Sequence, residues 1–318
     1  MDTSVSSFRR HFLERVGKPL KTSVSLKNYS HFRIGGKAEG FFEAHSVKDL
    51  TQGVEVARKH SFPYFIIGGG FNILFDDKGF RGLIIKNAVS GIKAKDKVVE
   101  CWSGTFLEEL IHFCKERGLA GLEFFAGIPG TVGGAVCSNA GAFGKEVGNY
   151  VQKASLLDRE GKKFEVGREY FSFGYRQSGI QKTLDIVLNV SFGLDKGSSV
   201  DIKKRMDEIL QEREKKHPPK HIACAGSYFK NPVLSSGEKV PAAELLEKVG
   251  AKKLEVGGAS VHPSHANFIF NRRNASSGDV LQLASELKRR VREKFGVELE
   301  EEVTYLPEKI SGSSPGRE

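Results

Sequence analysis

Hydrophobic residues recur at helical spacing in several parts of the chain. Near the N-terminus, Val5, Phe8, Phe12 and Val16 recur every three or four residues, which predicts a short amphipathic helix. Elsewhere, similar stripes of hydrophobic residues begin after a polar residue or end at a glycine. Both features are signals of a helix boundary. These further predicted helices span residues 46–60, 105–118, a charged stretch ending near 213, 241–249 and 278–295.

Short runs of β-branched and aromatic residues predict strands between these helices. The runs span residues 64–67, 82–85, 98–102, 151–157, 186–192 and 299–306. Strands and helices do not alternate strictly, which favours α+β domains over a doubly wound parallel sheet. At 318 residues the chain exceeds the usual size of one compact core, so more than one domain is expected.

The charge of the chain narrows the classes of partner. Lys and Arg number 49 against 39 Asp and Glu, a formal charge of +10. Much of this excess lies in helix-like runs that also contain Glu, which is typical of a solvated helix face. No helix-turn-helix, finger or aromatic RNA-binding signature accompanies it, so we predict no nucleic-acid partner and favour small anionic ligands.

The four cysteines predict neither a metal site nor disulfides. They are widely scattered, without a CxxC pair or histidines at zinc-ligand spacing, and are expected to be reduced and mostly buried. The N-terminus lacks the apolar core of a signal peptide, and no apolar run approaches the ~18 residues that span a bilayer. We therefore expect a cytoplasmic location and no membrane partner.

Two glycine-rich segments carry the clearest chemical signal. They are IIGGGFN at residues 66–72 and AGIPGTVGGAVCSNAGAFG at residues 126–144. Glycine lets backbone N–H groups converge on an anion, as in phosphate and pyrophosphate sites, and Asn72 and Asn139 offer side-chain hydrogen bonds. Tight turns or close strand contacts are the alternative, particularly for the first segment.

Neither of the common nucleotide-binding loops fits these segments. Gly127, Gly130 and Gly133 have GxxGxxG spacing, whereas the Rossmann fingerprint is GxGxxG within a βαβ unit. No GK[ST] follows the glycines, which excludes a Walker A loop. The glycine segments therefore predict a site for an anionic ligand in a fold that is neither a Rossmann fold nor a P-loop fold.

Several short motifs follow one another along the chain. They are NYSHFRIGGKA at 28–38, GGGFN at 68–72, GIPGTVGGA at 127–135, NAGAFG at 139–144, YRQS at 175–178, AGSYFKNP at 225–232 and LEEEV at 299–303. Each is modest alone, but in this order they make the chain resemble the UDP-N-acetylenolpyruvoylglucosamine reductases from about residue 26 to residue 306.

The resemblance implies an α+β fold with a vanillyl-alcohol-oxidase-type FAD-binding domain of two subdomains, followed by a smaller substrate-binding domain. The expected limits are an N-terminal extension at 1–25, the FAD-binding domain at 26–197, the substrate-binding domain at 203–306 and a flexible tail at 307–318. The implied enzyme is a monomer that uses NADPH, through FAD, to reduce the enolpyruvyl group of a UDP-sugar to UDP-N-acetylmuramate, a precursor of peptidoglycan.

By the same resemblance, Arg176, Ser227 and Glu302 are the catalytic residues. Addition of hydride to the enolpyruvyl group leaves enolate character beside a carboxylate, which a bidentate Arg stabilises. A serine hydroxyl can donate the proton that follows, and a glutamic acid with a raised pKa can help to organise the enol. Taken singly, each residue has a structural explanation, such as a surface ion pair or a turn.

The resemblance also implies residues that bind FAD and substrate. Those for FAD are Arg33, Gly68, Gly69, Gly70, Asn72, Gly127, Ile128, Pro129, Gly130, Thr131, Gly133, Gly134, Asn139, Ala140 and Gly141. Those for substrate are Tyr175, Lys215, Lys230, Asn231 and His265. Lys215, or its neighbour Lys216, is equally well explained as a solvated lysine, and His265 as a packed histidine.

Two departures from the family pattern bear on these expectations. Phe71 occupies the serine position of GGGSN, which removes a possible hydroxyl contact with phosphate. The stretch between Tyr175 and Ser227 has no inserted tyrosine loop, so the chain resembles the compact subtype. Two other functions remain open: a flavin oxidase of another alcohol or sugar, and a nucleotide-sugar-binding protein without catalysis.

Overall fold

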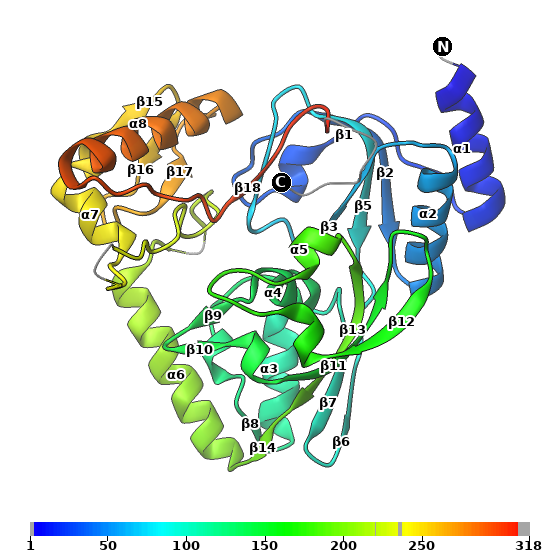
Figure 1. The fold of residues 1–318 in the computed structure, drawn as a ribbon, viewed down its shortest axis with the longest axis horizontal. Helices are drawn as coiled ribbons and strands as arrows, with labels where there is room; N and C mark the ends of the chain where they lie inside the picture. Colours follow the sequence, from blue (N-terminus) through cyan, green and yellow to red (C-terminus); the bar gives the residue numbers. More distant parts are fainter. Residues whose placement is uncertain (1–2, 220, 235–236, 311–318) are drawn as a thin grey trace.

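The computed structural model describes residues 3–219, 221–234 and 237–310. The chain forms three regions, which Figure 1 shows as separate groups of helices and strands. The predicted tail at 307–318 is described only as far as Ile310, and the rest of it lies outside the described residues.

The first region is a mixed sheet covered by two helices. Its strands lie in the order β1-β2-β5-β3, with β2, β5 and β3 parallel and β1 antiparallel to β2. Helix α1 packs on α2, and Phe8 and Phe12 of α1 join the core beneath. The elements are α1 (Thr3–Val16), β1 (Val24–Ser25), β2 (Lys37–Ala44), α2 (Val47–Lys59), β3 (Tyr64–Ile67) and β5 (Phe80–Asn87).

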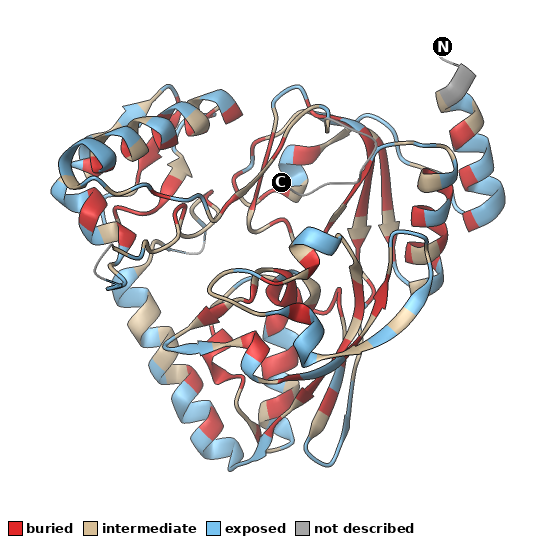
Figure 2. Cartoon of the chain, in the orientation of Figure 1, coloured by how far each residue is buried: buried red, intermediate tan, exposed pale blue. Residues whose placement is uncertain are grey.

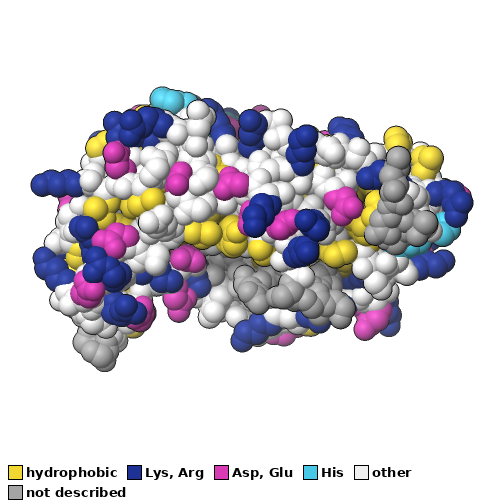
Figure 3. Space-filling model, turned by 90° about the horizontal axis from the view of Figure 1, so that it is seen from above, with side chains coloured by type: hydrophobic (Ala, Val, Ile, Leu, Met, Phe, Trp, Pro, Cys, Tyr) yellow, Lys and Arg dark blue, Asp and Glu magenta, His cyan; other side chains and the backbone are white. Residues whose placement is uncertain are grey.

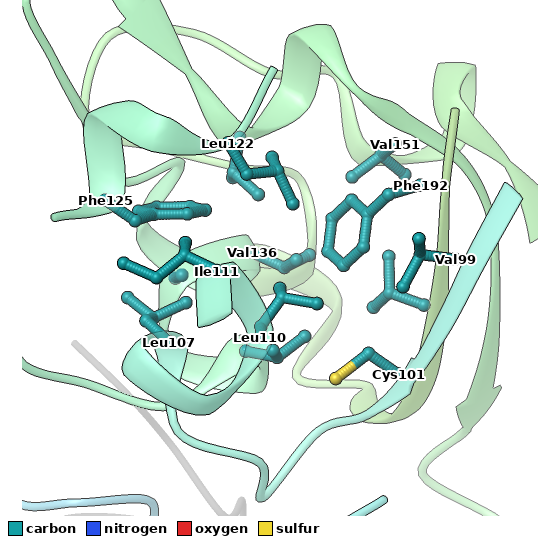
Figure 4. Close-up of a cluster of buried hydrophobic side chains, with 14 of the residues drawn as sticks. Val99, Cys101, Leu107, Leu110, Ile111, Leu122, Phe125, Val136, Val151 and Phe192 are labelled. Carbon is teal, nitrogen blue, oxygen red and sulfur yellow. The ribbon is translucent and has the colours of Figure 1, made fainter. Parts of the chain in front are cut away.

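The second region is an antiparallel sheet of order β12-β11-β13-β7-β6. Helices α3 and α4 pack against it through a buried cluster that includes Leu110, Val136 and Phe192 (Figure 4). The elements are β6 (Ile92–Lys95), β7 (Val98–Trp102), α3 (Leu107–Glu116), α4 (Val132–Ser138), β11 (Val151–Leu157), β12 (Lys163–Gly167) and β13 (Ile186–Gly193).

Helix α6 (Ser199–Lys216) leads from the second region to the third. Most of its surface is exposed, but Ile202 and Met206 are buried and Ile209 and Leu210 pack on the same core (Figure 2). These four residues recur every three or four positions and so form one apolar stripe along the helix. Although most of the sequence is charged, this stripe is sufficient to pack the helix against the core.

The third region contains helices α7 and α8 and a small antiparallel sheet of order β15-β16-β17. Its elements are α7 (Ala242–Lys248), β15 (Glu255–Val256), β16 (Ala259–Val261), β17 (Ile269–Asn271) and α8 (Ser277–Phe295). The chain then returns to the first region, where β18 (Thr304–Leu306) pairs in parallel with β4 (Ile73–Phe75). The third region is therefore joined to the rest of the molecule at both of its ends.

Shorter elements complete the secondary structure. Two-residue strands form two small antiparallel pairs, β8 with β14 and β9 with β10, and one short helix follows the second glycine-rich segment. Their bounds are β8 (Leu119–Ala120), β9 (Gly141–Ala142), β10 (Lys145–Glu146), α5 (Ile180–Thr183) and β14 (Asp195–Lys196).

Two local predictions from the sequence are wrong. Thr105 does not cap α3: its Oγ1 accepts a hydrogen bond from Gly91 N at 3.0 Å, and Phe106 is the N-cap residue without a side-chain hydrogen bond. The strand predicted at 299–306 is only three residues long, since β18 begins at Thr304. In the preceding segment Glu301 forms an isolated bridge with Phe229 instead.

The surface carries positive and negative side chains side by side, as the mixed charges of the sequence predict. Lys and Arg side chains lie among Asp and Glu side chains over the face seen from above (Figure 3). The four cysteines are buried, as predicted, and none of them forms a disulfide in the described residues. Among the helices of the described ranges, each is too short or too polar to traverse a bilayer.

Candidate active site

An ion pair between Arg176 and Glu302 lies between the second region and the returning C-terminal segment. Arg176 Nε is 2.9 Å from Glu302 Oε1, and the two side chains are only 22% and 23% exposed. The N–H of this Nε is poorly aligned with the Glu302 oxygen, so the contact is an ion pair without hydrogen-bond geometry. A half-buried cation whose donor is poorly matched to its carboxylate suits an anionic ligand, because such groups are costly to leave unsatisfied.

The backbone of Arg176 adds a second sign of function. Its φ of 54° lies in the left-handed region, which is strained for a residue with a side chain. Such strain costs about 1–3 kcal/mol and clusters at functional sites, where the surrounding structure holds it. The backbone conformation of Arg176 therefore indicates a functional position independently of the charge of its side chain.

The Glu302 carboxyl is held in an environment that favours its protonated form. Burial raises its pKa, and the nearby cations Arg176, Lys230 and Lys239 oppose this effect only in part. Desolvation penalises the charged carboxylate more than the neutral acid. Glu302 therefore keeps a proton to higher pH than an ordinary glutamate.

Backbone contacts bring the three predicted catalytic residues into one place. Asn72 Nδ2 donates to Glu302 O at 2.9 Å, and Glu302 N donates to Tyr228 O at 2.8 Å. Ser227 directly precedes Tyr228 and is partly exposed. The first glycine-rich segment and the AGSYFKNP segment thus hold Glu302 from two sides, with Arg176 paired to its side chain.

Several predicted substrate residues surround this pair. Asn231 N donates to the Tyr175 hydroxyl at 3.3 Å, and Lys230 pairs with Glu300 at 3.1 Å. Lys239, which sequence reasoning missed, places its Nζ 2.8 Å from the centre of the Tyr175 ring. Nothing in the local sequence marks this lysine, because a hairpin brings it to the site.

A cavity lies between the first and second regions. It has about 740 Å³ of space, including its solvent-filled mouth. One end is lined by residues of both glycine-rich segments, which are Gly68, Thr131, Gly133 and Gly134. The rest is lined mainly by β3, by the start of β13 and by residues near α5, namely Tyr64, Phe65, Ile66, Ile67, Ile180, Leu184, Asp185, Ile186 and Val187, together with Asn87, Ser103 and Cys137.

The two glycine-rich segments touch each other at this cavity. A Cβ on Gly68 would lie 2.4 Å from Thr131 Oγ1, so the contact requires glycine. Phe71 folds back on its own loop, since a Cβ on Gly69 would lie 2.4 Å from its ring. Part of the glycine content is therefore explained by packing, which was the alternative to a ligand site.

Internal hydrogen bonds occupy some groups that the sequence suggested for a ligand. Val132 N and Gly133 N donate to Thr105 O and Ser103 O at 2.9 and 2.8 Å. Asn139 Nδ2 donates to Glu146 and to Gly174 O, and its Oδ1 accepts from Gly148 N. The Asn139 side chain is thus committed to holding the loop, and the backbone of the segment faces the cavity elsewhere.

The remaining predicted residues lie at varied distances from the ion pair. Gly127, Ile128, Pro129 and Gly130 form the loop before α4, and Ala140 and Gly141 follow it. Lys215 is on the exposed side of α6 and pairs with Glu212 of the same helix. Arg33 is exposed and its guanidinium donates to His221 O at 3.4 Å.

His265 packs beside His217, which ends α6. Their ring centres are 5.7 Å apart, and both rings contact Phe268. Burial, together with the nearby cationic Arg213 and the ring of His265, lowers the pKa of His217 to about 4. His217 is therefore neutral in the folded chain at neutral pH.

Stability is expected to fall as pH drops from 6.5 towards 4, because the unfolded chain takes up a proton that folded His217 resists. The loss attributable to His217 is about 1–2 kcal/mol, since the ring is partly exposed to solvent. His217→Phe keeps the ring packing and removes the titration. Urea unfolding at pH 7 and pH 4 should show a smaller loss in this variant, and an equal loss would contradict the assignment.

Gly134→Ala is expected to raise the stability of helix α4 and to weaken ligand binding. An added Cβ would meet only Thr131 Oγ1, at 3.6 Å, and would otherwise enter the cavity. The substitution should stabilise the flavin-free chain by about 0.5–1 kcal/mol, because Gly is unfavourable within a helix. It should weaken FAD binding, measured by quenching of flavin fluorescence.

Gly53→Ala on α2 is the matched control for Gly134→Ala. Its Cβ would make only ordinary contacts with Phe12 and Phe42 at 3.6 Å, far from the cavity lining. This control should gain stability and bind FAD as the wild type does. Equal FAD affinity in the two variants would contradict a cofactor position beside Gly134.

Comparison with known proteins agrees with this geometry. The FAD-binding domain model matches residues 38–167, and the model for the UDP-N-acetylenolpyruvoylglucosamine reductase C-terminal domain matches residues 217–306. A UDP-N-acetylenolpyruvoylglucosamine reductase of Clostridium novyi is 38% identical over 290 residues, covering 91% of this chain and 92% of that protein. The chain belongs to the UDP-N-acetylenolpyruvoylglucosamine reductase family.

Other members of the reductase family give the same result. The Clostridium tetani reductase is 35% identical over 303 residues, covering 95% of this chain and 97% of that protein. The crystal structure of the Thermus caldophilus reductase has a TM-score of 0.74 and 32% identity, covering 91% of this chain and all of that one. The predicted family, its FAD-dependent oxidoreductase class and an α+β fold that contains an FAD-binding domain are confirmed.

Proposed function

We propose that this chain reduces UDP-N-acetylglucosamine enolpyruvate to UDP-N-acetylmuramate, with FAD as cofactor and NADPH as hydride donor, in the synthesis of peptidoglycan precursors. The observation that carries the proposal is the convergence of Arg176, Ser227 and Glu302 beside the glycine-rich segments. We further propose that the enzyme is cytoplasmic and monomeric, with residues 26–197 binding FAD and residues 203–306 binding the UDP-sugar.

The residues around the cavity fit FAD. The cavity is lined both by residues of the glycine-rich segments and by apolar side chains, which suits a ligand with an anionic centre and a flat aromatic part. Gly134 leaves open space where a side chain would otherwise project. Gly68, Thr131 and Gly134 are proposed to hold the pyrophosphate, and Asn72 links this end to Glu302.

Bound FAD would supply hydride transfer between the nicotinamide and the enolpyruvyl double bond. Arg176 is proposed to bind the substrate carboxylate through its guanidinium and to stabilise the charge that develops beside it. Ser227 donates the proton to the adjacent carbon. Burial raises the pKa of Glu302, and we propose that its protonated form donates a hydrogen bond to the enol oxygen without adding negative charge.

The substrate is proposed to extend from this pair over Tyr175, Lys230 and Asn231, with His265 at the far side of the site. Tyr175 and Asn231 are already joined by a hydrogen bond, so they present one preformed surface. Pre-organised contacts of this kind reduce the entropy that binding must overcome.

The test is a flavin spectrum followed by anaerobic titration. We expect the purified chain to bind FAD, NADPH to bleach the flavin, and the enolpyruvyl UDP-sugar to restore its absorbance. A chain that shows no flavin band even after addition of FAD would disprove the proposal. NADPH bleaching without reoxidation by the enolpyruvyl UDP-sugar would favour a flavin oxidase of another substrate, and binding of the UDP-sugar without any turnover would favour a binding protein.

A further inference from the structure

The cavity between the first and second regions has one carboxylate in its lining, that of Asp185. The other lining residues that the structure describes are glycines, apolar residues and residues with an amide, hydroxyl or thiol group. Asp185 lies between helix α5 and strand β13. A carboxylate accepts hydrogen bonds from hydroxyl and amino groups, so its place in the lining indicates which part of a ligand lies beside it.

The turn that carries Asp185 is fixed by its backbone and by Arg159. Leu184 ends α5 with a φ of 62°, in the left-handed region, which is unfavourable for a residue with a side chain. Arg159 donates from Nε to Thr183 O at 2.7 Å and from a terminal nitrogen to Lys182 O at 3.1 Å. A cation at this end of a helix satisfies carbonyl groups that lack a partner within the helix. The structure therefore holds a strained turn in place at the cavity wall.

Two hydroxyl groups hold the carboxylate of Asp185. Tyr170 donates its hydroxyl to Asp185 Oδ2 at 2.6 Å, and the Thr183 hydroxyl donates to the same oxygen. The hydrogen bond to Asp185 raises the pKa of Tyr170, so the phenol keeps its proton and acts as the donor. Both contacts use Oδ2, whereas each oxygen of a carboxylate can accept hydrogen bonds. Oδ1 is therefore available to donors of a ligand.

Strand β3 gives the cavity a direction. It runs from Tyr64 to Ile67, and Gly68 follows, so the lining residues Tyr64 and Gly68 are about 13 Å apart along an extended strand. Gly68 belongs to the glycine-rich segment that is proposed to hold the pyrophosphate. The same segment continues to Asn72, whose side chain donates to Glu302 O. Along the chain, the order is therefore Tyr64, the pyrophosphate segment and the contact with the catalytic pair.

Asp185 lies near the Tyr64 end of this order. Burial raises the pKa of Tyr64, and the positive charge of Arg159 is among the effects that oppose the increase, so Arg159 is close to the Tyr64 hydroxyl. The same guanidinium bonds to the carbonyl groups of the residues two and three positions before Asp185. Arg159 therefore links Tyr64 to the turn that carries Asp185.

The two halves of FAD match this order. The isoalloxazine has to reach the Arg176–Glu302 pair to react with the substrate, so it extends from the pyrophosphate towards Asn72. The adenosine half then extends towards Tyr64 and Asp185. A carboxylate repels phosphate but can accept hydrogen bonds from the hydroxyls of a ribose, as the acidic residue of dinucleotide-binding folds does.

We propose that the Asp185 carboxylate binds the ribose hydroxyls in the adenosine half of FAD. The inference rests on the proposed function, because it requires FAD in the cavity. Asp185 is then a cofactor-binding residue that fixes the direction in which FAD lies and takes no part in hydride or proton transfer. It stands outside the motifs that carry the resemblance to the reductase family.

The experiment measures the binding of two flavins to the flavin-free, full-length chain by fluorescence quenching. One is FAD, and the other is the analogue of FAD whose adenosine lacks both ribose hydroxyls. The wild-type chain should bind FAD about tenfold more tightly than the analogue, because hydrogen bonds to a charged group are strong. Asp185→Asn keeps the shape of the side chain and an acceptor for Tyr170. This variant should bind FAD about tenfold more weakly than the wild type and bind the two flavins almost equally.

Asp195→Asn is the matched control. Asp195 lies on β14, just beyond the other end of β13, and its side chain is 88% exposed beside Lys97. This variant should keep the wild-type affinity for FAD and the tenfold preference over the analogue. Urea unfolding of the flavin-free variants establishes that both are folded.

Equal affinity of the wild-type chain for FAD and the analogue would overturn the assignment of Asp185 and leave the proposed function standing, and this measurement needs no variant. A tenfold preference that persisted in Asp185→Asn would overturn the assignment too, because another group would then bind the ribose. A wild-type chain that binds neither flavin would overturn the proposed function and this assignment together.

Discussion

Ser227→Ala is expected to slow reduction of the enolpyruvyl substrate by about 10²–10⁴-fold, the usual contribution of a general acid. Glu302 N donates to the carbonyl of Tyr228, the residue after Ser227, so the backbone at Ser227 lies next to the segment that carries Glu302. Reduction of the flavin by NADPH should stay close to the wild-type rate, because that step needs no proton from Ser227. Stopped-flow absorbance of the flavin measures the two half-reactions separately.

Ser155→Ala is a suitable control for Ser227→Ala. Ser155 lies on β11 in the second region and is likewise partly exposed. Both half-reactions should be unaffected in this variant. If Ser227→Ala slowed flavin reduction as much as substrate reduction, the residue would have a structural role, and unchanged turnover would show that the proton comes from elsewhere.

Gly70→Ala is expected to lower the free energy of unfolding by about 3 kcal/mol or more and to abolish FAD binding. A Cβ at this position would lie 1.8 Å from the backbone oxygen of Tyr29, and φ is +70°. The loop that carries Asn72 would have to move, and with it the contact to Glu302. Urea unfolding and FAD titration measure the two effects.

Gly17→Ala provides the comparison for backbone strain alone. Gly17 has a nearly equal φ of +74° but no atom within 4 Å of an added Cβ. This variant should lose only about 1 kcal/mol and bind FAD normally. Equal losses in Gly17→Ala and Gly70→Ala would show that the close contact with Tyr29 is not decisive.

The helices with local signals at both ends could be predicted closely from the sequence. Ser46 accepts a hydrogen bond from Asp49 N at the start of α2, and Gly296 ends α8 with a φ of 67°. Thr105 carries the same kind of signal but bonds to Gly91, which is distant in sequence. A cap signal fails when a tertiary partner competes for the same side chain.

The site was predictable only where residues stand in recognisable motifs. Arg176, Ser227 and Glu302 were expected together from the resemblance, and the structure brings them together. Lys239 was not expected, because its position depends on a hairpin fixed by Asn231. The segment before β18 was mistaken for part of one continuous strand; its extended backbone instead bonds to residues 228–230.

The hydrogen bond from Asn72 to Glu302 joins residues 230 positions apart in the sequence. A ribosome adds residues from the N-terminus, so the cofactor region can fold while the residues that complete the site are still being synthesised. Contacts between residues so far apart in the sequence also form late in folding, because they close the longest loops of the chain. The growing chain should therefore acquire its flavin before it acquires Glu302, and nascent chains that end before β18 should bind FAD without reducing substrate.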